Sequence, residues 1–396
     1  MKKLFTTNNL LLTGILILAG FLRFWRITQF PAGFNADEAA IGYNAWSVLK
    51  TGKDEFGDFL PITFTSFGDF KPPLYFYLDL PFILIFGLNE LAVRLPNALA
   101  GVGTVFLVFL IVKKISKNYS LAALSSLALA ISPWHIHYSR GGFDTNLFTF
   151  FLTLGTLFFL KAFEKPKYLF FSSIIFAVSF YSYQGARLTM PIFVIALAVI
   201  FFQRLLKIKK EMVIAALLGF VLILPALTTF LIGTGQVRFS GVSIFADPGP
   251  FWATNELRGQ PANPAGLISE IFHNKLQAYG TFFFKNYFEH FSGNFLVISG
   301  DPISRNNIPE TGVAYLFDIP FLLAGLYFLF KKLDKFWAVP VVWLLIAPIA
   351  SAITFQSPQA TRSEAMVVPL TMISAFGLYH FLKMILPHKK IFVLFL

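Results

Sequence analysis

The chain of 396 residues contains no cysteine and few charged residues. The absence of cysteine excludes disulfides and thiolate metal sites, and it leaves the redox compartment undetermined. Charged residues make up only 13% of the chain and hydrophobic residues 56%, which is more apolar than a soluble domain of this length can bury. The composition therefore predicts a polytopic membrane protein.

The net charge of +12 does not indicate a nucleic-acid partner. The basic residues occur in short clusters between apolar runs, where they orient membrane spans. We therefore expect the partners to be membrane lipids and membrane-associated substrates, with no nucleic acid among them.

Apolar runs predict about ten membrane-spanning helices in one polytopic domain, residues 1–396. Lys2 and Lys3 precede the first run, so the positive-inside rule places the N-terminus in the cytoplasm, and every second connection is also basic. The apolar run that begins at Ile391 has no closing polar flank at Leu396, which is typical of a span whose continuation is missing. The expected spans are 8–24, 95–112, 120–134, 146–162, 168–183, 188–204, 211–232, 313–330, 336–354 and 365–384.

Two long connections, residues 25–94 and 233–312, are predicted to lie on the outer face. The first contains an amphipathic stretch from Ala39 to Leu49, which ends at Gly52 and predicts a helix lying along the interface. The second begins with Pro/Gly-rich sequence and turns aromatic from Phe282 to Phe291, as expected of a flexible lid followed by an interfacial helix.

Asp37 and Glu38 are adjacent carboxylates in the first outer connection, which suggests surface chemistry at the bilayer. A second interpretation competes with this one, because Asn35 and Glu38 have the spacing of a capping box at the start of the interfacial helix. The pattern alone leaves catalysis and capping both open.

Several strings in the outer connections resemble a known family over about the first 190 residues. They are DEAAIGYNAW (Asp37 to Trp46), FGDFKPPLYFYL (Phe67 to Leu78), RLP at Arg94 and SPWHIHYSRGGFD (Ser132 to Asp144). In order and approximate spacing they resemble the GT-C glycosyltransferases of the protein mannosyltransferase and lipid A aminoarabinose transferase group, which is glycosyltransferase family 39-like. The resemblance implies an all-α integral membrane protein, a GT-C multi-span bundle with interfacial helices in two long outer loops.

The resemblance also implies an activity. Enzymes of this group move a sugar from a polyprenyl-phosphate carrier to an acceptor on the outer face of the membrane, and we expect inversion at the anomeric carbon. Aminoarabinose transferases tend to carry a basic residue soon after the acidic pair, whereas this chain has Ala39 and Ala40, which argues against an aminoarabinose donor. The identity of the sugar stays open, as does the class of acceptor: protein, lipid or glycan. The expected location is the cytoplasmic membrane of a prokaryote.

Roles for individual residues follow from the same resemblance. A base must take the acceptor's proton while positive charge receives the departing lipid phosphate. Asp37 is the expected base, with Glu38 beside it and Asp144 as a second acidic contributor. No cofactor is implied and no ligand cluster demands a metal, although metal dependence stays open. The expected phosphate-binding residues are Lys71, Arg94, Arg140 and Arg187, and Asp69, His137, Tyr183 and Gln184 are weaker candidates for contacts with substrate.

Each of these residues also has a structural alternative. Lys71 could extend to lipid headgroups. Arg140 and Asp144 could form an ordinary helical ion pair, although Gly141 and Gly142 argue against a continuous helix between them. The alternate spacing of His135 and His137 could indicate a metal pair, but interfacial packing beside Trp134 is favoured, and an aromatic belt could equally explain Tyr183, Gln184 and Arg187.

Two other functions fit the topology. A secondary transporter would normally place ionisable residues at mid-membrane, and the predicted spans have almost no charge at their centres. A flippase or scaffold for lipid-linked sugars could use the same basic residues for headgroup recognition alone.

Overall fold

The computed structural model describes residues 7–232, 240–259, 266, 271, 273–308, 310–331 and 334–386. Lys2 and Lys3, the start of the second outer connection at 233–239 and the terminal apolar run at 391–396 lie outside the described residues.

The described chain is almost entirely helical. The first half contains α1 (Thr7–Phe24), α2 (Ala36–Thr51), β1 (Phe64–Ser66), β2 (Asp69–Lys71), α3 (Leu74–Phe86), α4 (Glu90–Ser116), α5 (Tyr119–Ile131), α6 (Pro133–Arg140), α7 (Asp144–Ala162), α8 (Tyr168–Phe180) and α9 (Ala186–Ile200). The second half contains α10 (Phe202–Leu205), η1 (Leu206–Ile208), α11 (Lys209–Ile232), η2 (Ile244–Ala246), α13 (Gly249–Gly259), α15 (Lys275–Glu289), η3 (Asn294–Ile298), η4 (Ser304–Asn306), α16 (Asp318–Lys331), α17 (Ala338–Ile346), α18 (Ile349–Ala352), α19 (Ala360–Ser363), η5 (Glu364–Met366) and α20 (Val367–Ile385).

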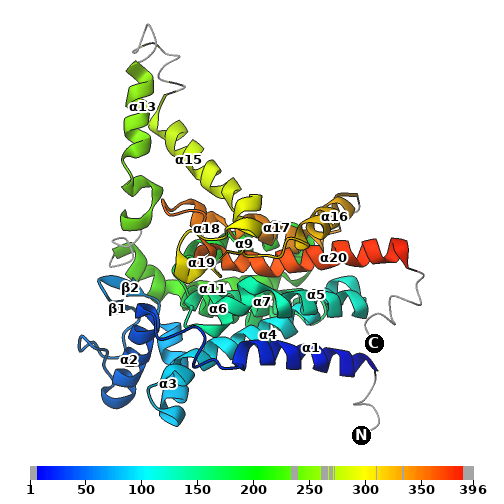
Figure 1. Cartoon of the computed structure of the whole chain (residues 1–396), viewed down its shortest axis with the longest axis horizontal. Coiled ribbons are helices and arrows are strands. Elements are labelled where there is room, and N and C mark those ends of the chain that lie inside the picture. The colour runs from blue at the N-terminus through cyan, green and yellow to red at the C-terminus, as the bar shows by residue number, and fades with distance from the viewer. Residues whose placement is uncertain are drawn as a thin grey trace.

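The long apolar helices lie side by side as one bundle. In Figure 1, α1, α4, α5, α7 and α20 run in nearly the same direction, α2, α3, β1 and β2 lie together at one end of them, and α13 extends away from the bundle. Among the described residues, four segments are long and apolar enough to cross a membrane by length and composition. They are Glu90–Ser116, Asp144–Ala162, Phe202–Thr229 and Ala360–Ile385, and shorter apolar helices accompany them. The predicted fold class of a helical, multi-span membrane protein is confirmed.

Glycines let two of these helices approach closely. A Cβ atom at Gly377 of α20 would lie 1.9 Å from the carbonyl oxygen of Phe321, and one at Gly325 of α16 would lie 2.1 Å from that of Ile373. No side chain fits at such distances, so the contact between α16 and α20 requires glycine on both helices. Small residues at helix crossings are a common way to pack helices within a membrane.

Three of the predicted spans are not continuous helices in the structure. The run 120–134 is broken where Ser132 caps a new helix and Pro133 takes its first position, which suits a proline because it has no N–H to donate. The run 336–354 is interrupted between α17 and α18, and Pro348 caps the second of these helices. The run 313–330 becomes helical only at Asp318, because the N–H group of Ala314 donates instead to the carbonyl of Leu296 at 2.7 Å.

A two-stranded sheet departs from the all-helical expectation. β1 and β2 pair antiparallel, with Phe64 opposite Lys71 and Ser66 opposite Asp69. The connecting residues Phe67 and Gly68 have φ values of 50° and 74°, which suit the tight turn of a hairpin. This hairpin sets the direction of the Lys71 side chain.

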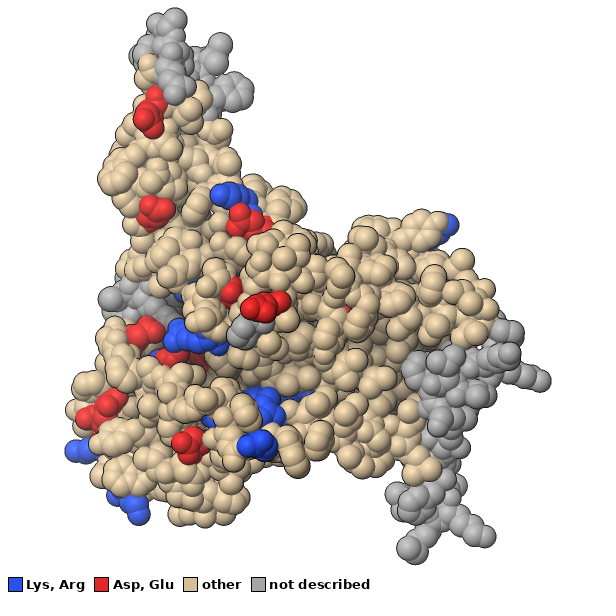
Figure 2. Space-filling model, viewed as in Figure 1, with Lys and Arg blue, Asp and Glu red and all other residues tan. Residues whose placement is uncertain are grey.

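Charged side chains are unevenly distributed on the face of the molecule that Figure 2 shows. Most of the blue and red atoms lie in the left half of the view, while the body of the bundle is largely uncharged. The uncharged body matches a bundle whose middle lies in lipid.

The topology can be tested with single cysteines, because the native chain has none. We expect Asn255→Cys in α13 to react with an impermeant thiol reagent in intact cells, and Lys209→Cys at the start of α11 to react only after the cells are opened. Labelling of the Lys209→Cys protein but not of the Asn255→Cys protein in intact cells would contradict the predicted orientation.

Candidate active site

A polar cavity of about 150 Å³ lies at the end of the bundle that carries α2 and the hairpin. Its walls come from segments that are far apart in the sequence. The lining residues are Asp37, Ile41, Asp69, Lys71, Pro72, Tyr75, Phe76, Gly142, Phe143, Asp144, Tyr183, Arg305, Asn306, Gln359, Thr361 and Arg362.

The first turn of α2 places Asp37 at this cavity. Asn35 caps the helix by accepting a hydrogen bond from the N–H group of Glu38 at 2.9 Å, and the Glu38 carboxylate accepts one from the N–H group of Asn35 at 3.1 Å. The expected capping box is therefore present. Gly52 ends the helix with φ 73°, as expected. Asp37 takes no part in the capping box, and its side chain is 46% exposed.

Glu38 forms a buried ion pair with Arg94. The Arg94 Nε atom lies 2.7 Å from Glu38 Oε1, and its Nη2 atom lies 3.1 Å from Oε2, so the contact is bidentate. Glu38 Oε1 also accepts a hydrogen bond from the N–H group of Gly142 at 2.9 Å. The other groups that accept hydrogen bonds from Arg94 are the carbonyls of Ile27, Pro31 and Gly33.

This geometry argues against a phosphate-binding role for Arg94. Its side chain is fully buried and occupied by Glu38 and by three carbonyl groups, and it is not among the residues that line the cavity. Of the two adjacent carboxylates, Glu38 therefore connects α2 to Arg94 and to Gly142, and Asp37 faces the cavity.

Lys71 leaves the end of β2 and forms an ion pair with Asp37 Oδ1. Its side chain is largely buried, and Lys71 is among the residues that line the cavity. The lysine thus faces the cavity and not the lipid headgroups.

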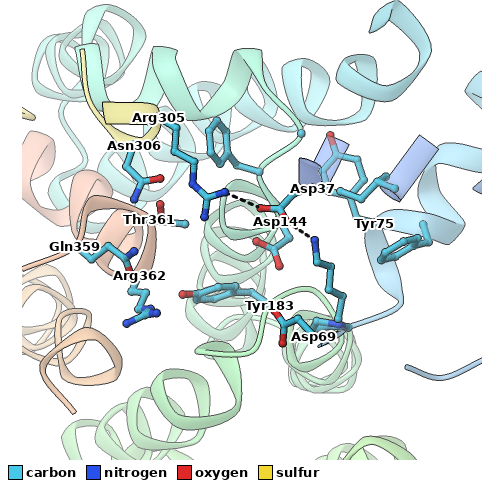
Figure 3. Close-up of a pocket in the computed structure, with 16 residues that line it drawn as sticks. Asp37, Asp69, Tyr75, Asp144, Tyr183, Arg305, Asn306, Gln359, Thr361 and Arg362 are labelled. Atoms are coloured by element: carbon cyan, nitrogen blue, oxygen red, sulfur yellow. Dashed lines mark hydrogen bonds and ion pairs between the residues drawn. The ribbon is translucent and has the colours of Figure 1, made fainter. Parts of the chain in front are cut away.

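A second cation approaches Asp37 from the other side. Arg305 of η4 places its Nη1 atom 3.6 Å from Asp37 Oδ2, so Asp37 lies between two positive charges (Figure 3). Residues 233–312 also contain Arg238 and Arg258, and nothing in the local sequence distinguishes Arg305 from them. Only the fold brings it to the cavity.

A buried aspartate accepts hydrogen bonds that hold η4 against α19. Asp301 accepts hydrogen bonds from the N–H groups of Ile303 at 2.8 Å and Ala360 at 2.6 Å, and from the side chain of Asn306 at 3.2 Å. Burial raises the pKa of Asp301, and these hydrogen bonds oppose that shift. The same contacts bring Thr361 and Arg362 of α19 to the wall opposite Asp37.

His137 supports the backbone of Arg305 and does not line the cavity. Its Nε2–H group donates to the carbonyl oxygen of Arg305 at 3.1 Å, because a carbonyl can only accept, and burial lowers the pKa of His137. His135 is buried and pairs through Nδ1 with Arg23 at 2.6 Å. Among the described residues, no group of three or more His, Asp or Glu residues is placed to hold a metal ion.

Arg140 and Asp144 do not form a helical ion pair. The helix ends at Arg140, and α7 begins at Asp144, because the chain is extended at Gly141 and passes close to Glu38 at Gly142. A Cβ atom at Gly142 would lie 2.7 Å from Glu38 Cγ, so this approach requires glycine. Asp144 lines the cavity, whereas Arg140 donates to the carbonyls of Leu22, Trp25 and Phe30.

The connection between α8 and α9 forms another wall. Tyr183 lines the cavity, and the side chain of Gln184 donates to the carbonyl of Phe70 in β2 at 2.7 Å. Gln184 thus joins this connection to the hairpin that carries Lys71. Arg187, in the first turn of α9, is not among the residues that line the cavity. Asp69, which was also a candidate for substrate contact, does line it.

Taken together, fold and cavity define a multi-pass membrane protein with a charged site at one end of a helical bundle. Residues 70–228 match the family described as dolichyl-phosphate-mannose-protein mannosyltransferase. The resemblance to GT-C, family 39-like glycosyltransferases is therefore confirmed.

Curated relatives agree with this assignment over part of their length. The chain is 31% identical over 156 residues to the Bacillus subtilis (strain 168) protein named "Putative mannosyltransferase YycA", covering 39% of this chain and 22% of that protein. It is also 31% identical over 189 residues to an uncharacterized protein of Aquifex aeolicus (strain VF5), covering 46% of this chain and 36% of that protein. The chain thus spans well under half the length of these relatives.

Solved structures share the fold. The structure of ArnT from Cupriavidus metallidurans bound to undecaprenyl phosphate matches with a TM-score of 0.59 at 11% identity, over 93% of this chain and 59% of that chain. The structure of the archaeal oligosaccharyltransferase AglB from Archaeoglobus fulgidus, in complex with an inhibitory peptide and a dolichol-phosphate, also matches with a TM-score of 0.59, at 14% identity, over 95% and 50% of the two chains. At these identities the likeness establishes the fold alone.

The buried pair predicts a large stability effect at Glu38. Glu38→Gln leaves the Arg94 guanidinium buried without a counter-charge, so we expect a loss of about 3–5 kcal/mol in the free energy of unfolding. The thermal unfolding midpoint of the purified protein measures this loss. Glu164→Gln is the matched control, because Glu164 pairs with Lys114 while its side chain is 70% exposed, and exposed pairs contribute about 1 kcal/mol or less. Equal midpoints for the two variants would contradict the proposed importance of the buried pair.

Proposed function

We propose that this protein is an inverting glycosyltransferase that moves a sugar from a polyprenyl-phosphate carrier to an acceptor hydroxyl on the outer face of the cytoplasmic membrane of a prokaryote. One observation carries the proposal: a partly exposed carboxylate, Asp37, lies between the cations Lys71 and Arg305 in a cavity at one end of a membrane bundle. The family match and the shared fold support the same class of reaction.

The two kinds of charge suit the two ends of the transfer. Asp37 takes the proton of the acceptor hydroxyl while that oxygen forms a bond to the anomeric carbon. The bond between the anomeric carbon and the phosphate oxygen breaks, and its electron pair leaves with the carrier phosphate. Lys71 and Arg305 stabilise that added negative charge. Direct displacement on the face opposite the phosphate inverts the anomeric carbon.

The ion pairs seen at Asp37 fit the order of binding that this chemistry requires. Before a donor binds, the two cations neutralise the carboxylate. A phosphate that attracts Lys71 and Arg305 takes these partners from Asp37, and a carboxylate with fewer cationic partners is a stronger base. Donor binding thus prepares the base for the acceptor.

The remaining acidic residues of the cavity suit a sugar. Asp69 and Asp144 line the same space as Asp37, and carboxylates accept hydrogen bonds from sugar hydroxyl groups. Arg305 takes the supporting place in phosphate binding that the resemblance implied for Arg94, Arg140 and Arg187, because none of those three arginines lines the cavity.

A second cleft supports a lipid-linked donor. It has a volume of about 340 Å³ and lies among α7, α8, α9 and α11, with walls that include Phe176, Met190 and Phe220. Its two serines are already satisfied, since Ser172 donates to the carbonyl of Gly155 and Ser173 to that of Ala215. Apolar cavities of this kind do not hold water well, whereas an isoprenoid chain suits them. The connection between α8 and α9 carries Tyr183 and so joins the walls of the two spaces.

Asp37→Asn tests the base. Asparagine keeps the size of the side chain and suits the first turn of a helix, but it cannot accept the acceptor's proton, so turnover should fall roughly 100- to 10,000-fold. Transfer is followed as release of polyprenyl phosphate, at matched expression and thermal stability, and donor binding is measured separately. Full turnover would remove the catalytic role, and loss of donor binding together with turnover would favour a carrier-recognition protein over an enzyme.

Lys71→Ala tests the phosphate contact. We expect the transition state to lose about 2–4 kcal/mol of stabilisation, with part of the activity retained in Lys71→Arg. Arg305→Ala should lower turnover in the same direction. Lys50→Ala serves as the control, because Lys50 is an exposed lysine at the end of α2 and does not line the cavity. Unchanged donor affinity and turnover in Lys71→Ala would show that Lys71 does not bind the donor phosphate.

A further inference from the structure

A glutamine in the wall of the cavity has a side-chain oxygen without a partner. Gln359 lines the cavity and is only 6% exposed, and its Oε1 atom is buried without a hydrogen bond to any residue that the structure describes. An unpaired buried carbonyl oxygen costs free energy, so most such groups in proteins have a partner. Because Gln359 lines a cavity, a bound ligand can supply that partner.

The backbone at Gln359 is fixed on both sides. The Gln359 N–H group donates to Nε2 of His290 at 3.4 Å, and the next N–H group, that of Ala360, donates to Asp301. The Gln359 carbonyl oxygen accepts a hydrogen bond from the hydroxyl of Ser363 at 2.7 Å. The side chain therefore starts from a fixed point, and only its own torsions decide where the carboxamide lies.

His290 contacts this segment from the end of α15. Burial lowers the pKa of His290 to about 4, so its ring is neutral near pH 7. The Nδ1–H group donates to the carbonyl of Asn286 at 2.8 Å, which leaves Nε2 as the acceptor for Gln359. Asn286 is also buried and donates to the carbonyls of Ala352 at 3.2 Å and Thr354 at 3.0 Å. Asn286 and His290, one helical turn apart, thus hold the segment that ends at Gln359.

A sugar hydroxyl suits the carboxamide of Gln359 better than a phosphate does. The Oε1 atom needs a donor, and a carrier phosphate offers acceptor oxygens whose charge Lys71 and Arg305 can meet. A hydroxyl group both donates and accepts, so it suits a carboxamide in either orientation. The sugar is bonded directly to the phosphate and must therefore lie close to these two cations. Figure 3 shows Gln359 on the same side of the cavity as Asn306, the residue that follows Arg305.

We propose that Gln359 is a specificity-determining residue that accepts a hydrogen bond from one hydroxyl group of the transferred sugar. This inference rests on the proposed transfer from a polyprenyl-phosphate carrier, and it adds the wall that recognises the sugar. A sugar that lacks this hydroxyl leaves the glutamine oxygen buried and unpaired, so the site rejects it. The donor class is therefore a sugar with a free hydroxyl at the position that faces Gln359, and not the corresponding deoxy sugar.

Donor binding with and without the sugar tests this contact. The protein in nanodiscs is titrated with bare polyprenyl phosphate and with polyprenyl phosphate that carries mannose, glucose or galactose. We expect at least one sugar to raise the affinity above that of the bare carrier. Gln359→Met should lower the affinity for that donor by about 5- to 150-fold and leave the affinity for the bare carrier unchanged. Gln356→Met is the matched control, because Gln356 lies in the same segment, is exposed and does not line the cavity.

Two results of the titrations would overturn the proposal. One is equal affinity of Gln359→Met and the native protein for every sugar-bearing donor, as expected of a carboxamide that meets only water. The other is an equal loss of affinity for the bare carrier, as expected of a structural role. The thermal unfolding midpoint of each variant confirms that the bundle is intact before affinities are compared.

Deoxy donors give a test that begins with the native protein. Removal of one hydroxyl at a time from the best donor should identify a position at which kcat/KM for release of polyprenyl phosphate falls at least about ten-fold, and Gln359→Met should bring this ratio close to one. A ratio that is the same in the variant would overturn the sugar contact while the transfer reaction stands. No release from any donor would contradict the proposed transfer, whereas the titrations would still decide whether Gln359 binds the sugar.

Discussion

The buried pair between Glu38 and Arg94 is the interaction on which the outer end of the structure depends. Arg94 joins the start of α2 to the chain that follows α1, through the carbonyls it binds. Glu38 joins the same point to Gly142, between α6 and α7. A charge pair without access to water is stable only when all its partners are in place. The pair therefore holds three connections in one arrangement.

That arrangement explains why two adjacent carboxylates behave differently. Glu38 is buried, doubly bonded to Arg94 and part of the cap of α2, whereas Asp37 points the other way and remains partly exposed between Lys71 and Arg305. The helix start that the pair secures gives Asp37 a fixed position relative to β2 and η4. Capping and catalysis compete as interpretations of the sequence. In the structure Glu38 is the residue that takes part in capping, and the catalytic role proposed here belongs to Asp37, which lines the cavity.

Local features of the site could be predicted from the sequence because their causes are local. Asn35, Glu38 and Gly52 define the ends of α2 through contacts within a few residues, and Gly141 and Gly142 mark a break in the helix. The family resemblance implied roles for Asp37 and Lys71 at the site, and these two side chains form an ion pair in the structure. The hairpin that carries Lys71 escaped prediction because its strands are only three residues each.

The rest of the site depends on contacts between distant segments. Nothing near Arg305 in the sequence shows that Asp301, His137 and Asn306 will hold it against α19, so it looked like any other outer arginine. Arg94 and Arg140 had the charge expected of phosphate ligands, but carbonyl groups and Glu38 already occupy them. A sequence pattern reports the type of a side chain, and only the fold reports which group it meets.

The stereochemistry of sugar transfer tests the central claim most directly. The full-length protein is purified in nanodiscs and supplied with a panel of polyprenyl-phosphate sugars of known anomeric configuration, together with protein, lipid and glycan acceptors. The account predicts release of polyprenyl phosphate from at least one donor, with a product whose anomeric configuration is the opposite of the donor's. A product with the donor's own configuration would contradict direct displacement assisted by Asp37, and the absence of release from every donor would contradict the proposed class of reaction.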